Sequence, residues 1–174
     1  MCELTAGYTK PLCASFGGTK SVIAYNTENL NTYTLSAGGE SLSVLTLNSG
    51  KQGWKILPDM ASIDFTETAT RSRENNSIFF ASTCAITLKD DTPETRTLVN
   101  LISKGFVTIV QEKENGINLV YGLSNGMTVE TSAITTGMNY EDLNGVVISL
   151  VGKETAIAPS VDDTIALSLL TPAV

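Results

Sequence analysis

Residues 77–122 constrain the fold more than any other part of the chain, because the hydrophobic period changes within them. Apolar side chains first alternate with polar ones over residues 78–88, as in a strand with one buried face. They then recur every three or four residues over 98–102, as on one side of a helix. Two further apolar runs, 106–113 and 117–122, flank a turn signal. This order predicts a strand, a short helix and a two-stranded hairpin.

The predicted helix covers residues 93–104. Thr92 is a favourable N-cap, Pro93 suits the first helical position, and Glu94 places negative charge in the first turn. Gly105 is expected to end the helix in the left-handed conformation. A helix of about 12 residues is roughly 18 Å long and is too short to be stable alone in water. We therefore expect its apolar side to pack on a sheet.

The turn signal is Asn115-Gly116, which favours a type I′ turn with positive φ at both residues. A two-residue loop at this place would pair Val110 with Tyr121. Apolar side chains occupy both faces of the resulting hairpin. We therefore expect both faces to be covered, one of them by the helix.

A longer hairpin is predicted at residues 61–89, with a polar tip at 72–76. Residues 61–70 alternate and pair with the strand that begins near Ile78. Arms of about ten residues extend roughly 30 Å, which is longer than a compact domain of this size needs. A strand pair that reaches beyond its own core is expected to be covered by another subunit.

Other strands are predicted near residues 19–25, 41–47, 127–133 and 146–151, and residues 164–170 are expected to form a last strand or to lie on a neighbour. Asn144-Gly145 is expected to form a tight turn. Residues 1–18 are interpreted as an N-terminal arm, and 19–174 as a single β domain. The lone Trp54 is expected to be a packing anchor.

Composition limits the possible functions. The 174 residues are 42% hydrophobic and 17% charged, which predicts one globular domain with its own core. The net charge of −7 repels phosphate, so a nucleic-acid reader and a binder of anionic membranes are disfavoured. The first residues lack the features of a signal peptide, and no segment is long enough to span a bilayer. We therefore expect a soluble protein made in a cytoplasm.

The residue types argue against catalysis. The chain has no histidine, the commonest general base and metal ligand. Its cysteines are Cys2, Cys13 and Cys84, and no two of them have the spacing of a zinc site. Cys84 is expected in the core, whereas a disulfide between Cys2 and Cys13 is left open. The adjacent carboxylates at 90–91 and 162–163 are expected in solvated loops. We predict no enzyme activity, no cofactor and no metal.

The order of these elements resembles the tail-tube fold of tailed bacteriophages, and the chain is similar to virion structural proteins of phages of gut Bacteroidetes. The residues that carry this resemblance are Phe106-Val107-Thr108-Ile109-Val110, Asn115-Gly116, Val120-Tyr121-Gly122, Asn125-Gly126-Met127, Thr136-Gly137, Asp142-Leu143-Asn144-Gly145 and Val151-Gly152-Lys153-Glu154, with Leu4-Thr5-Ala6-Gly7-Tyr8, Cys13 and Gly17-Gly18 at the start.

The resemblance implies a mainly β fold with one short helix (α+β), an antiparallel β-sandwich or barrel of tail-tube type with a long extended hairpin. It implies a cyclic homo-oligomer, a ring of six or twelve subunits in the tail or neck of a virion, assembled in the cytoplasm of a bacterial host. Other tail or portal proteins would be its partners, and DNA would pass through the lumen without sticking.

In that ring, the long hairpin would line the lumen or stack on the next ring, and the arm would reach neighbouring subunits. The candidate lumen or subunit-interface residues are Asp64, Phe65, Glu67, Arg71, Arg73, Phe79 and Phe80. Asp64 and Glu67 have opposite parity, so at most one of them faces the bore. The structural turn residues are Gly105, Asn115, Gly116, Asn144 and Gly145.

Two alternatives to the tube or ring remain. One is a capsid decoration or adhesion domain, which would be a defined monomer or trimer. The other is a small β-sandwich that binds a carbohydrate or other small ligand, with Trp54 beside Tyr25 or Tyr121 as its platform.

Overall fold

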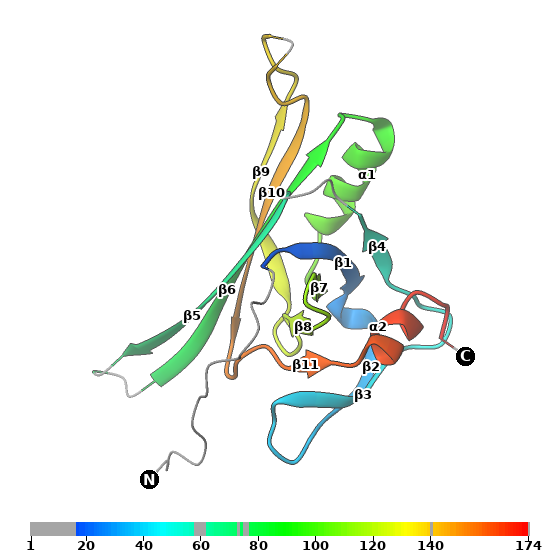
Figure 1. Ribbon diagram of the computed structural model, residues 1–174, viewed down its shortest axis with the longest axis vertical. Coiled ribbons are helices and arrows are strands. Elements are labelled where there is room, and N and C mark those ends of the chain that lie inside the picture. Colours follow the sequence, from blue (N-terminus) through cyan, green and yellow to red (C-terminus); the bar gives the residue numbers. More distant parts are fainter. Residues whose placement is uncertain (1–16, 58–61, 73, 75–76, 140, 174) are drawn as a thin grey trace.

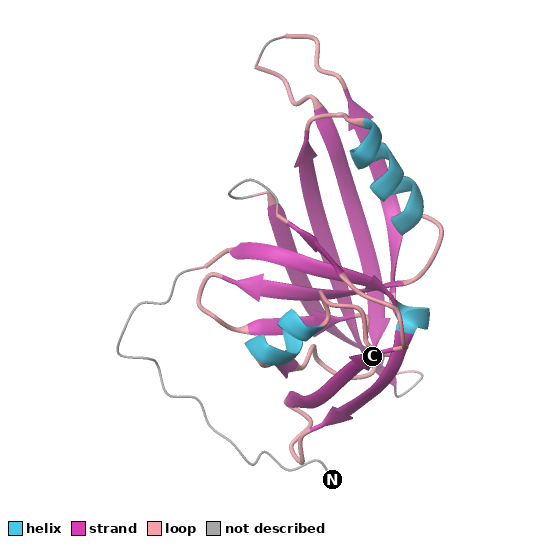
Figure 2. Ribbon diagram, turned by 90° about the vertical axis from the view of Figure 1, so that its right-hand side faces the viewer, coloured by secondary structure: helices cyan, strands magenta, loops and turns pink. Residues whose placement is uncertain are grey.

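The protein is mainly β, with two α-helices beside one large open sheet (Figures 1 and 2). The computed structural model describes residues 17–57, 62–72, 74, 77–139 and 141–173. The strands are β1 (Thr19–Asn26), β2 (Leu30–Leu35), β3 (Ser41–Leu47), β4 (Trp54–Ile56), β5 (Ile63–Ser72), β6 (Ser77–Lys89), β7 (Val107–Lys113), β8 (Asn118–Tyr121), β9 (Met127–Thr135), β10 (Gly145–Glu154) and β11 (Ser160–Val161). The helices are α1 (Pro93–Ile102) and α2 (Asp163–Ser168), with a 3-10 turn at Thr27–Asn29.

The sheet follows the order β2-β3-β11-β8-β7-β9-β10-β6-β5; β1 joins it through β7, and β4 pairs with β1. Its pairings are antiparallel except for the short parallel contact of β11 with β3. The expected antiparallel, mainly β fold is therefore confirmed. The expected closed barrel is not, because β2 and β5 end the sheet without pairing to each other.

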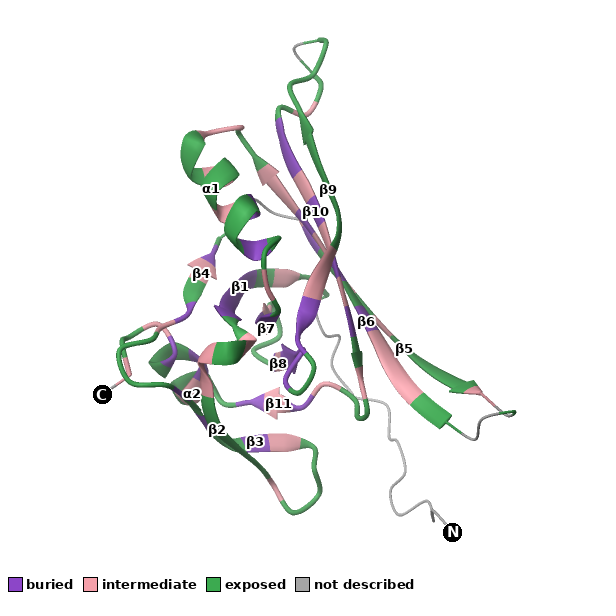
Figure 3. Cartoon of the chain, turned by 180° about the vertical axis from the view of Figure 1, so that it is seen from behind, coloured by how far each residue is buried: buried purple, intermediate pink, exposed green. Residues whose placement is uncertain are grey.

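Two apolar cores lie on opposite sides of β7. The first is formed by residues of β1, β6, β7, β10 and α1, and includes Val22, Ile86, Ile109 and Ile148. The second is formed by residues of β1, β3, β7, β8 and α2, and includes Ile23, Leu45, Val110, Val120 and Ala166. Figure 3 shows the buried residues concentrated where these strands meet. Each face of β7 and β8 is thus covered, as the sequence predicts.

The expected start of α1 is confirmed, but its end differs. The Thr92 hydroxyl accepts a hydrogen bond from the Thr95 amide at 3.2 Å, and Pro93 begins the helix. The helix ends at Ile102, and Gly105 does not have positive φ, so the expected left-handed cap is wrong. Ser103 instead donates its hydroxyl proton to the Val99 carbonyl at 2.7 Å, which satisfies an acceptor of the last turn.

The turn between β7 and β8 has three residues instead of two. The Lys113 amide bonds to the Ile117 carbonyl at 3.2 Å, which encloses residues 114–116. Gly116 has a φ of +79°, whereas Asn115 does not have positive φ. The predicted type I′ turn is therefore wrong, because Asn115 lacks the positive φ that this turn requires. The prediction of positive φ at Gly116 is confirmed.

The extra loop residue shifts the register of this hairpin by one. Val110 lies opposite Val120, and Ile109 lies opposite Tyr121, so the predicted pairing of Val110 with Tyr121 is wrong. A one-residue shift moves side chains to the other face of a strand. Tyr121 consequently belongs to the first core and Val120 to the second.

The C-terminal segment forms the helix α2, whereas the sequence predicted a last strand or a segment lying on a neighbour. Asp162 caps α2, because its carboxylate accepts hydrogen bonds from the amide and hydroxyl of Thr164 at 2.9 and 2.7 Å. Ala166 and Leu169 are buried in the second core. A short apolar run is compatible with the period of a helix or of a strand. Here the helix allows Ala166 and Leu169 to pack with residues of β3 and β7. The prediction of a single helix is therefore wrong.

Gly145 is not in a tight turn. It begins β10 and pairs with Lys89 and Thr135 on the two neighbouring strands. A Cβ atom at this position would lie 2.2 Å from the Leu88 carbonyl oxygen. The glycine is thus required by the close approach of two backbones and not by its φ.

Replacing this glycine tests that requirement. We expect Gly145→Ala to lower the free energy of unfolding by about 1–3 kcal/mol, because the backbone of β6 or β10 must move. Gly105→Ala is the matched control, since no atom lies within 4 Å of the added methyl group. Its effect is expected to stay within about 0.5 kcal/mol. Urea unfolding of both variants measures the difference, and equal losses would contradict the close approach.

Candidate assembly surface

The β5–β6 hairpin extends away from the body of the protein (Figure 1). β10 pairs with β6 only as far as Phe80, which faces Glu154. Beyond that point, residues 70–72 pair with residues 77–79 and with no other strand. The tip, defined here as residues 69–72 and 77–80, therefore has neither of its faces against the core clusters.

The tip exposes apolar side chains. Ile78 is 55% exposed, and it lies directly opposite Arg71 on the neighbouring strand. Phe80 is half-buried, and alternation along β6 places it on the same face as Ile78. Phe79 lies on the other face, where the Lys153 ammonium sits 5.3 Å from the centre of its ring. Arg73 lies outside the described residues.

Two of the predicted interface residues instead anchor the hairpin to its own body. Phe65 stacks on Tyr121 with 4.8 Å between ring centres. The Glu67 carboxylate accepts a hydrogen bond from the Ala158 amide at 3.0 Å. Both side chains therefore lie on the core-facing side of the hairpin. The sequence showed their parity but not what lies opposite them.

A buried polar chain continues from this anchor. The Tyr121 hydroxyl donates to the Gln111 side chain at 3.3 Å, and the Gln111 amide nitrogen donates to the Thr19 hydroxyl at 2.6 Å. Burial, with a smaller contribution from the charge of Glu67, raises the pKa of Tyr121 to about 12. The tyrosine therefore stays neutral and keeps its proton for Gln111. The hairpin leaves the body from a fixed base.

The outward face of the four-stranded part, β9-β10-β6-β5, carries few charged side chains. On this face lie Thr66, Thr68 and Thr70 of β5, Ala81, Thr83, Ala85 and Thr87 of β6, and Val147, Ser149 and Val151 of β10. Its charged residues include Asp64 of β5, Lys153 of β10 and Glu130 of β9, which is exposed and lines one hollow with Thr83, Val151 and Lys153. Asp64 is exposed here, so of the two predicted carboxylates it is the one that faces away from the core.

Both margins of this four-stranded part are open. Among the described residues, β5 ends the sheet, and β9 beyond Met127 pairs only with β10. The strands alternate in direction, so β5 and β9 run in opposite senses. Open margins present unpaired backbone groups, which favour the addition of another strand.

The expected aromatic platform does not form. Trp54 is 66% exposed, so its predicted role as a packing anchor is wrong; it lies on the three-residue strand β4, which pairs only with β1. Tyr25 is buried in the second core, and Tyr121 is stacked on Phe65 inside the protein. The hollow that Trp54 and Tyr25 share is about 170 Å³, smaller than the ~300 Å³ at which ligand pockets usually begin.

Other chemistry is sparse in the part of the chain that the structure describes. Cys84 is fully buried, as predicted, and burial raises the pKa of its thiol. No group of three or more His, Cys, Asp and Glu side chains there could hold a metal ion. None of the described helices is long and apolar enough to cross a bilayer. The predicted arm and the pair Cys2 and Cys13 lie outside the described residues, except for Gly17 and Gly18 at the arm's end.

Comparison with family models, curated proteins and solved structures gives no match.

The loop between β9 and β10 presents a single methionine. Met138 is 97% exposed, beside Gly137 with a φ of +68°. The Asp142 carboxylate accepts hydrogen bonds from the amides of Asn139 and Met138 at 2.8 and 2.9 Å. These backbone bonds lower the pKa of Asp142. The Asp142 carboxylate thus ties its part of the loop to the backbone of residues 138 and 139.

Titration tests this loop. Because the pKa of Asp142 is lower in the folded loop than in the unfolded chain, its ordering effect is complete at neutral pH and is lost as the pH falls through the folded value. We expect the amide shifts of Met138 and Asn139 to titrate with a midpoint below the usual aspartate pKa. Asp142→Asn should abolish this titration and slightly lower the urea midpoint at neutral pH, because the stabilisation by the charged carboxylate is lost. A midpoint at or above the usual value would contradict the geometry.

Proposed function

We propose that this chain is a structural virion protein, a subunit of a phage tail tube or head-to-tail ring through which DNA passes. The observation that carries the proposal is the four-stranded part of the sheet, with two open margins of opposite direction and a hairpin that extends past the body. The tail-tube character of the fold is part of this proposal, and so is a ring of six or twelve copies.

Strand directions support a ring. A rotation about an axis roughly along the strands leaves every copy in the same orientation. β5 of one copy then lies beside β9 of the next, and the two are antiparallel because the four strands alternate. Head-to-tail contacts of this kind close into a ring when the rotation closes. An odd number of alternating strands would instead bring parallel margins together.

The character of the outward face supports DNA as cargo. Side chains on this face are mostly hydroxyl or small, and its charged residues include the carboxylates Asp64 and Glu130 as well as Lys153. Phosphate binding depends on clusters of Lys and Arg, which this face lacks among the residues named above. A wall of this kind does not retain DNA. Of the two carboxylates named as lumen candidates, Asp64 lies on this face and Glu67 lies on the core side.

The exposed tip gives the proposal its most direct test. We expect the purified chain to form rings or tubes as its concentration rises, seen by light scattering and negative-stain microscopy. Ile78→Asp should raise the concentration needed by about ten-fold or more, since it places a charge on the apolar tip. Leu167→Asp is the matched control, because Leu167 is 52% exposed on α2.

A monomer or trimer at every concentration would contradict the ring and would fit a capsid decoration instead. Equal loss of assembly in both variants would show that surface charge, and not the tip, is responsible.

DNA passage tests the assignment of the bore. In virions that carry Asp64→Lys, we expect slower DNA ejection, because the bore face then holds an excess of positive charge. Glu114→Lys makes the same charge change at the exposed loop between β7 and β8 and serves as the control. Ejection kinetics that are unchanged by Asp64→Lys would exclude this face as the bore.

A further inference from the structure

A hollow lies beside the base of the hairpin. Its walls come from β2, β5 and the segment 154–159, and they include Tyr33, Leu35, Glu67 and Ile157. Tyr33, Leu35 and Ile157 are 40%, 41% and 59% exposed, which is high for large apolar side chains beside one opening. We call it the hairpin hollow. It lies on the core-facing side of the hairpin, where Ser82 of β6 also lines it.

The volume of the hairpin hollow limits what can enter it. At about 170 Å³ it is smaller than the ~300 Å³ at which small-molecule sites usually begin. A dry cavity of about 150 Å³ holds one benzene-sized group, as in the engineered cavity from which that figure comes. The hollow therefore fits one large apolar side chain and not a cofactor or a sugar.

The charge of the hairpin hollow limits its occupant further. Its lining includes Glu67 and Glu154 and no Lys or Arg. The Glu154 carboxylate accepts hydrogen bonds from the amides of Ser124 and Asn125 at 3.1 and 2.9 Å, so it is fixed in place. A carboxylate has about four acceptor positions and can still receive a guanidinium. The best occupant is an apolar side chain with a positive charge beside it.

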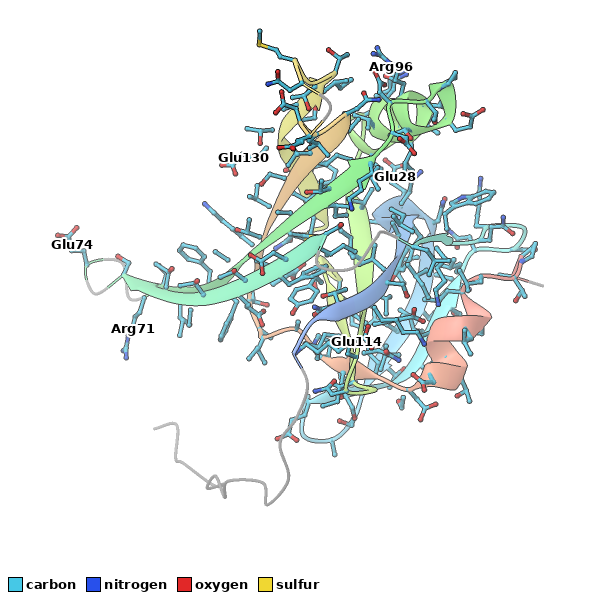
Figure 4. All side chains as sticks on the ribbon, turned by 45° about the horizontal axis from the view of Figure 1, so that its top comes forward. Glu28, Arg71, Glu74, Arg96, Glu114 and Glu130 are labelled. Atoms are coloured by element: carbon cyan, nitrogen blue, oxygen red, sulfur yellow. The ribbon has the colours of Figure 1, made fainter. Side chains whose placement is uncertain are left out.

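The tip of the hairpin has this combination. Ile78 and Arg71 are direct cross-strand partners, so both project from the same face. Figure 4 shows Arg71 extending away from the hairpin ribbon. The tip cannot fill the hollow of its own chain, because Ile78 lies four residues beyond Ser82 on an extended strand, about 13 Å away. The tip can therefore enter a hairpin hollow only on a second copy.

We infer that Ile78 of one copy enters the hairpin hollow of an adjacent copy, with Arg71 beside Glu67 and Glu154. This inference rests on the proposed self-assembly and names its contact. The tip and the hollow are different surfaces, so the contact is directional and repeats from copy to copy instead of closing a dimer. It also removes the apolar tip from water.

Disulfide trapping tests this contact. Two variants are made in a background with Cys2→Ser and Cys13→Ser: Ile78→Cys with a long affinity tag, and Leu35→Cys without a tag. Mixing them under mild oxidation should give the mixed disulfide as the main product. Ile78→Cys mixed with Leu167→Cys is the control, and we expect at least ten-fold less product. Mixed disulfide at the control level, or Ile78→Cys alone forming the major dimer, would overturn the inference.

A charge variant gives an independent measurement. Arg71→Glu should raise the concentration needed for assembly by about ten-fold or more. Arg71→Lys keeps the positive charge, so we expect that concentration to stay close to the wild-type value. Thr70→Glu adds a carboxylate one residue away on the opposite face, and we expect a smaller effect. Equal effects of Arg71→Glu and Thr70→Glu would overturn the pairing of Arg71 with the hollow.

These outcomes separate the inference from the function on which it rests. Rings that form without the trapped contact would leave the proposed function intact and remove the inference. A chain that stays monomeric at all concentrations would remove both.

Discussion

The fold depends on the burial of β7 on both of its faces. Ile109 packs into the first core and Val110 into the second, and the neighbouring strands β1 and β8 likewise contribute to both cores. Both cores lose a wall if β7 moves. β7 can contribute to both cores because its consecutive apolar residues leave neither of its faces exposed to solvent.

The hairpin is fixed at its base, whereas its tip lies outside both core clusters. The stack of Phe65 on Tyr121 and the bond from Ala158 to Glu67 hold the base. Farther out, Ile78 keeps more than half of its surface in water. Burying apolar surface stabilises a complex by about 25 cal/mol for each Å². Covering the exposed tip with another molecule would therefore favour association.

The outward face, the open margins and the tip are all used in the proposed assembly. In the proposed assembly, the margins would join copies side by side, the outward face would line the bore, and the tip would make a directional contact between copies. Each feature uses different residues, so each can fail without the others. Asp64 is the residue where the sequence left two options, and the structure places it on the outward face, with Glu67 on the core side.

The sequence alone determined the elements with a strong local period or a strong local signal: the strands of the long hairpin, the start of α1 at Thr92, and the burial of β7 on both faces. These follow from the repeat of the backbone and from hydrogen bonds within a few residues. Only the tertiary structure decided the one-residue register that moved Tyr121 to the first core, the helix at the C-terminus and the exposure of Trp54. Those outcomes depend on contacts between residues far apart in the chain, for which a local pattern carries no information.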